Sequence, residues 1–133
     1  MISINLLPRK EFEILCDGKT IPGKFGTWSA KRFSDIKKLT LKQLGAYLDQ
    51  ELQLGDVVLN ILCAVEYACR RSKVPFTYTE MDVCEWIDEM GGVHSDMFLE
   101  LCSHARSELA EVEDEKKNSL NGTSSNEQAT AQA

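Results

Sequence analysis

Two cysteines and both histidines in the second half of the chain could in principle hold a metal ion: Cys84, His94, Cys102 and His104. Structural zinc sites use thiolate and imidazole ligands, usually in closely spaced pairs. These four residues match no such spacing, and the two cysteines also fit the apolar stripes of helices. We therefore expect no metal site and no cofactor.

Three acidic residues recur at helical spacing, Asp82, Glu85 and Glu89. Carboxylates that share a helix face could attract cations or a basic partner, although such a face is more often simply solvated. The chain also lacks a phosphate-binding glycine loop, a paired metal motif and a nucleophile elbow. The sequence therefore predicts a protein that is not an enzyme.

A basic patch lies before the middle of the chain, formed by Lys31, Arg32, Lys37, Lys38 and Lys42. The two short helical segments around it are similar in outline to a helix-turn-helix. However, the second segment continues into residues 49–51, DQE, whose carboxylates would be repelled by phosphates in a DNA groove. A DNA-associated regulator is therefore the alternative interpretation.

Charge is distributed unevenly over the 133 residues, whose net charge is −6. Residues 1–42 carry nine Lys/Arg against four Asp/Glu, and residues 43–133 carry six against seventeen. This split disfavours wrapping of nucleic acid by the whole molecule, and it suits protein partners or head-to-tail self-association.

The length and the cysteines indicate a single reduced domain. A chain of 133 residues is long enough for one ordinary core, which we place in residues 1–112. The odd number of cysteines, five, favours free thiols buried as small apolar residues. The first residues lack a basic leader. The longest apolar stretch, residues 57–69, is interrupted by Asn60 and Glu66 and is too short to span a membrane. We therefore expect a cytoplasmic protein.

A β-hairpin is predicted over residues 11–25. Phe12, Ile14 and Cys16 alternate on one face, and Asp17-Gly18 supplies a tight turn. Pro22 cannot donate a hydrogen bond to a neighbouring strand, so the second strand should lie at a sheet edge with helices packed beneath the hairpin.

Helices are predicted over most of residues 28–112. Thr27, Thr79 and Ser95 are expected helix caps, and Thr40 with Gln43 forms a capping box. Trp28, Ala30, Phe33 and Ile36 are spaced to share one face of the first helix, and Leu41, Leu44, Leu48 and Leu52 form an apolar stripe on the second. The helix over residues 57–69 is apolar around most of its circumference, which is typical of a central helix. The fold class is therefore α+β, predominantly α-helical, with an N-terminal hairpin on a four- or five-helix core. The polar residues 113–133 are expected to be disordered.

Four apolar residues are candidate core anchors or protein-binding residues: Trp28, Phe33, Leu62 and Trp86. Large aromatic side chains usually anchor a core, but an exposed one is a strong binding hot spot.

The chain resembles the small tail assembly chaperones of tailed bacteriophages and prophages. The resemblance covers roughly residues 10–112 and is carried by Asp17-Gly18-Lys19, by residues 24–33, KFGTWSAKRF, by Leu39-Thr40-Leu41, and by the long apolar helix that follows. It implies a non-enzymatic protein that binds the long helical tape measure protein in the host cytoplasm and is absent from the finished particle. Such proteins are often made in two lengths by ribosomal frameshifting. Lys116-Lys117 could mark the slippery site, which would make a longer form of the chain a second partner.

Overall fold

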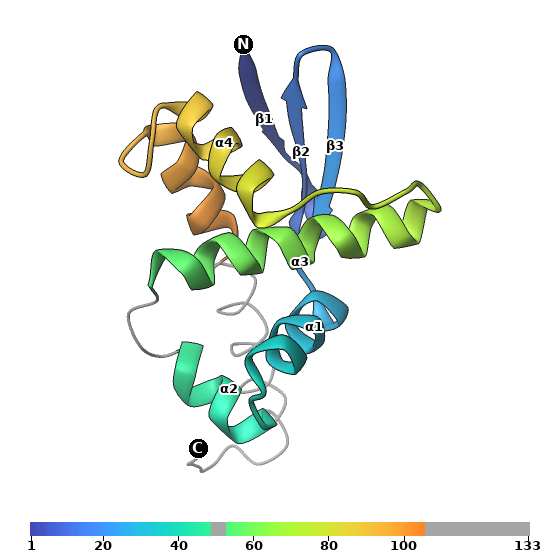
Figure 1. Ribbon diagram of the computed structural model, residues 1–133, viewed down its shortest axis with the longest axis vertical. Helices are drawn as coiled ribbons and strands as arrows, with labels where there is room; N and C mark the ends of the chain where they lie inside the picture. The colour runs from blue at the N-terminus through green and yellow to red at the C-terminus, as the bar shows by residue number, and fades with distance from the viewer. Residues whose placement is uncertain (49–52, 106–133) are drawn as a thin grey trace, which may run out of the picture.

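The computed structural model describes residues 1–48 and 53–105 (Figure 1). Its elements follow in the order β1 (Ile2–Leu6), the 3-10 turn η1 (Pro8–Lys10), β2 (Glu11–Cys16), β3 (Lys19–Lys24), α1 (Thr27–Lys37), α2 (Leu41–Leu48), α3 (Leu54–Ser72), α4 (Glu80–Met90) and a last helix over residues 96–105. The predicted α+β class is therefore confirmed. The end of the predicted last helix and the predicted disordered tail, residues 113–133, lie outside the described residues.

The strands form one antiparallel sheet in the order β1-β2-β3. The predicted hairpin is confirmed, with Cys16 opposite Lys19 across a turn in which Asp17 and Gly18 both have positive φ, 53° and 77°. Pro22 lies opposite Glu13 in β3, and β3 is an edge strand as predicted. The sequence analysis missed β1, which pairs with the other side of β2.

The main core lies where α3 and α4 pack against the sheet. Its most deeply buried members come from every layer and include Phe12, Ile14, Val65, Val83 and Leu101. The helix over residues 96–105 therefore belongs to the core through Leu101, which is fully buried. Burial of these apolar side chains supplies most of the stabilisation of the fold.

A second, smaller cluster lies on the side of α3 away from the sheet, where Figure 1 shows α1 and α2. Its buried residues are Phe33, Leu59 and Cys63, with Leu39 and Leu44 packed against them. This cluster attaches α1 and α2 to the central helix.

Most predicted helix caps are confirmed, but the central helix begins at Leu54 and not at the predicted Val57. The Thr40 and Gln43 side chains each accept a hydrogen bond from the backbone N–H of the other residue, and Thr79 forms the same reciprocal box with Asp82. One predicted cap was wrong, because α1 is capped by Gly26 and not by Thr27. The hydroxyl of the buried Ser29 accepts from the Gly26 N–H, so this polar contact lies one residue earlier in the chain than expected.

Two predicted apolar faces needed correction. Ile36 was expected to share the buried face of α1, but its side chain is 43% exposed. Leu41, expected on the apolar stripe of α2, is 86% exposed, because the second cluster reaches only as far as Leu44. Leu52, at the end of this stripe, lies outside the described residues.

The cysteines are free, as expected, but only Cys63 and Cys69 are fully buried. Cys16 and Cys102 are half-buried, and Cys84 is exposed, which contradicts the prediction that it packs in the core. The core side of α4 is instead formed by Val83, Trp86 and Ile87.

Candidate functional site

The candidate metal ligands named from the sequence do not form a site. Cys84 and His94 are exposed, and Nε2 of His104 lies 3.0 Å from the backbone oxygen of Glu11. Within residues 1–48 and 53–105, the one trio of ligand-type groups that converges within 4.8 Å is Cys16, Asp17 and Glu89.

This trio is better described as a thiol hydrogen-bonded to two carboxylates. The sulfur of Cys16 lies 3.7 Å from Oδ2 of Asp17 and 3.6 Å from Oε1 of Glu89. Burial and the two negative charges raise the pKa of the Cys16 thiol, so the protonated form, which donates a hydrogen bond, is favoured over the metal-binding thiolate.

The acidic residues of α4 also have separate roles. Asp82 accepts the hydrogen bond from the Thr79 backbone, Glu89 faces Cys16, and Glu85 is exposed to solvent. They do not act together as one carboxylate site.

Three cations of the predicted basic patch are paired with carboxylates. Lys31 pairs with Asp35 at 2.7 Å, Arg32 with Glu66 at 3.1 Å and Lys37 with Asp56 at 2.9 Å. Lys38 ends α1 in the left-handed conformation, with φ 60°. The patch is therefore a set of ion pairs rather than an uninterrupted basic surface.

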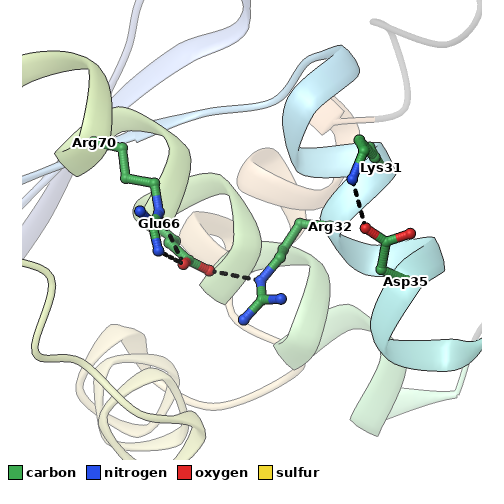
Figure 2. A network of polar contacts seen from close by, with 5 residues as sticks. All are labelled: Lys31, Arg32, Asp35, Glu66 and Arg70. Carbon is green, nitrogen blue, oxygen red and sulfur yellow. Dashed lines mark hydrogen bonds and ion pairs between the residues drawn. The ribbon is translucent and has the colours of Figure 1, made fainter.

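Glu66 is the centre of one of these networks, drawn in Figure 2. This residue lies on the central helix α3, and although it is charged its side chain is only 7% exposed. Oε1 accepts a hydrogen bond from Nε of Arg32, and Oε2 accepts from Nε and Nη2 of Arg70 at 3.1 and 2.9 Å. Two guanidinium groups therefore share one buried carboxylate, an arrangement that compensates for its desolvation.

The network opens into a cleft of about 190 Å³ between α1 and α3, lined by Trp28, Lys31, Arg32, Asp35, Glu66 and Arg70. Trp28 is half-buried and stacks on Tyr67, with ring centroids 5.6 Å apart. The guanidinium carbon of Arg70 lies 5.6 Å from the centre of the Trp28 ring. The cleft is thus lined by an aromatic ring and by guanidinium groups that hydrogen bonds to Glu66 hold in place. The sequence analysis missed it, because the residues that form it are far apart in the chain.

The four predicted anchors occupy different places. Phe33 is buried in the second cluster and Trp86 in the main core, where Leu62 is partly buried. Trp28 lies at the cleft. The structure therefore does not bring these anchors together into one surface.

A polar network connects α2 with α1 and α3. The ring of Tyr47 packs edge-on against Phe33, and Lys37 lies 5.6 Å from the centre of the Tyr47 ring. Burial of Asp56 raises its pKa, but hydrogen bonds from Tyr47 and Lys37 outweigh burial and hold the pKa below its usual value. The second cluster is therefore supported by a charged carboxylate at the start of α3.

Large apolar side chains remain exposed on all three helices that build the second cluster. Ile36 on α1, Leu41 on α2 and Leu54 on α3 are 43%, 86% and 52% exposed. Exposed apolar side chains of this size are candidate contacts for another protein where they lie close together.

No protein-family model, curated protein or solved structure matches the chain. Among the described residues, no helix is both long and apolar enough to cross a membrane.

Proposed function

We propose that this chain is a non-enzymatic tail assembly chaperone of a tailed bacteriophage or prophage. In this proposal it binds the tape measure protein in the host cytoplasm, keeps it soluble until the tail tube assembles, and leaves before the particle is complete. A frameshifted longer form and further copies of the chain are proposed additional partners. The sequence support is the resemblance carried by residues 24–33 and by Leu39-Thr40-Leu41.

The observation that carries the proposal is the exposure of large apolar side chains on the three helices of the second cluster. Ile36, Leu41 and Leu54 project from these helices, whose shared core has three buried members among the described residues, Phe33, Leu59 and Cys63. An apolar stripe of a client helix could cover these side chains and enlarge this small core.

The attachment of α2 supports the same proposal. Leu44 packs against the second cluster, and Tyr47 contacts Phe33 and Lys37. A helix that is held by a few side chains can adjust to a client at low energetic cost. Moderate affinity per copy would be enough, because a long client offers many adjacent sites.

The alternative proposal, a DNA-associated regulator that uses residues 31–42, has weaker support. Lys31, Arg32 and Lys37 are each paired with a carboxylate, which lowers the net positive charge available to phosphates. Salt-dependent binding to a DNA duplex that is lost on charge reversal at Lys38 and Lys42 would favour the regulator.

The test is co-expression of the full chain with the tape measure protein encoded in the same genome, followed by co-purification. Leu41→Ser should lower recovery of the soluble complex at least several-fold. Met81→Ser is the matched control, because Met81 is a large apolar residue on α4 that is 71% exposed. An insoluble client with no complex, despite a folded chain, would contradict the proposal, and so would equal losses in the two variants.

A further inference from the structure

The cleft at Glu66 carries an excess of one positive charge. Among the described residues, its lining contains three cations, Lys31, Arg32 and Arg70, and two carboxylates, Asp35 and Glu66. Lys31 and Asp35 neutralise each other at 2.7 Å, whereas the single charge of Glu66 is shared by two guanidinium groups. One guanidinium is therefore left without its own counter-charge.

Of the two guanidinium groups, that of Arg32 makes fewer hydrogen bonds to Glu66. Its Nε donates to Glu66, and within the described part of the chain its two Nη nitrogens have no hydrogen-bond acceptor. Figure 2 shows this Nη end turned away from Glu66. The Arg32 side chain is 44% exposed, so solvent or a ligand can reach it. The hydrogen bond at Nε fixes the orientation of the planar guanidinium group. This lowers the conformational entropy that is lost when the two Nη groups, the guanidinium fork, bind a ligand.

The size and the walls of the cleft limit what can enter. A volume of about 190 Å³ is below the range of about 300–1,000 Å³ that is typical of sites for whole small molecules, so the cleft suits one side chain. Trp28 offers an apolar wall for the methylene groups of that side chain. The two carboxylates, Asp35 and Glu66, would repel a doubly charged group, whereas a single negative charge matches the excess.

We propose that this cleft binds a glutamate or aspartate side chain from an acidic peptide segment of a partner protein. The carboxylate oxygens accept hydrogen bonds from the two Nη groups of Arg32, and the side-chain stem lies against Trp28. Planar carboxylates match the guanidinium fork in this way. The inference is independent of the proposed chaperone function, because it rests on charged groups of α1 and α3 and invokes no apolar client.

The test titrates the full chain with a hexaglutamate peptide by isothermal calorimetry at constant, low ionic strength. Saturable binding is expected, with affinity at least tenfold weaker for Arg32→Gln. Arg32→Lys, which keeps the charge but loses the fork, should also bind several-fold more weakly. Lys19→Gln removes one exposed cation from the hairpin end and should leave the affinity unchanged.

A second readout locates the peptide. The chain has two tryptophans, so Trp86→Phe leaves Trp28 as the single tryptophan, and its fluorescence should change along the same binding curve. Absence of saturable binding, or equal weakening by Arg32→Gln and Lys19→Gln, would overturn the proposal in favour of general charge attraction. Tighter binding of inorganic phosphate than of the peptide would also overturn it and indicate a phosphate site. Circular dichroism checks that each variant is folded. If Arg32→Gln is not folded, the affinity of Arg32→Lys for the peptide decides the test.

Discussion

The ring of Phe12 lies over Gly23 on the neighbouring strand, in the space where any other residue would place its Cβ. Phe12 is 1% exposed in the main core and packs on Phe25, with ring centroids 5.1 Å apart, so a shift of its ring would disturb other core contacts. We expect Gly23→Ala to lower the free energy of unfolding by about 1–3 kcal/mol, because it overpacks this contact. Urea unfolding followed by circular dichroism measures the change.

Gly45→Ala is the control for this substitution. Gly45 lies inside α2, and among the described residues nothing beyond the nearby backbone of this helix comes within 4 Å of the position its Cβ would occupy. Alanine is a better helix former than glycine, so the variant should gain up to about 1 kcal/mol. Equal losses at the two positions would contradict the role assigned to Phe12.

Stability should depend on the ionisation of Asp56. Its pKa in the folded protein is lowered, so its contribution is fully present above the usual value of 3.8 and is lost as the pH falls through the lower, folded-state pKa. We expect the stability difference between the wild type and Asp56→Asn to shrink as the pH falls from about 5 to below 3. Asp35→Asn breaks an exposed ion pair and should have a small effect throughout. A constant difference for Asp56→Asn would contradict this prediction.

The thiols should differ in reactivity. Burial, helped by the charge of Glu66, raises the pKa of Cys63 to about 12, and burial also raises the pKa of Cys69. Since the thiolate is the reactive form, a disulfide reagent at pH 8 should modify the exposed Cys84 first and reach Cys63 and Cys69 only after unfolding. Peptide mapping by mass spectrometry identifies the order. Labelling of Cys63 as fast as Cys84 in the folded chain would be inconsistent with the described core.

Two leucines test whether the helix over residues 96–105 is an integral part of the fold. Leu101 is fully buried, whereas Leu99 is 51% exposed on the same helix. Leu101→Ala should lower the free energy of unfolding by about 2–5 kcal/mol because it leaves a cavity. Leu99→Ala should change it by no more than about 0.5 kcal/mol. Similar effects of the two substitutions would indicate that this helix packs differently.

Local signals were sufficient to predict the hairpin and most helix ends, since Asp17-Gly18 and the capping boxes act within a few residues. They were not sufficient for β1. Ile2 and Ile4 alternate with polar residues, but the strand joins β2 through a turn in which Arg9 and Lys10 both have φ 62°. Neither residue type signals a positive φ, so Pro8, which opens η1, was the local sign that the chain reverses there.

The cleft could not be predicted for a related reason. Glu66 breaks an apolar run in the sequence and was treated only as an interruption of it. Its partner Arg32 is 34 residues away, on another helix. The packing of α1 on α3, which brings the two together, depends on buried residues such as Phe33 and Leu59 rather than on any charge pattern. The basic patch was visible in the sequence, as was Asp35 four residues after Lys31, but the distant carboxylates that pair with Arg32 and Lys37 were not.

Pro22 in the middle of β3 has a consequence for how copies of the chain behave when they are crowded together. An edge strand offers a row of backbone groups on which a strand of another molecule can be added, the first step of sheet-to-sheet aggregation. Pro22 has no N–H to offer, so an incoming strand would meet a missing donor halfway along this edge. The hairpin thus carries its own protection at one of the two edges of the sheet, in a protein that we propose acts in many copies along one client.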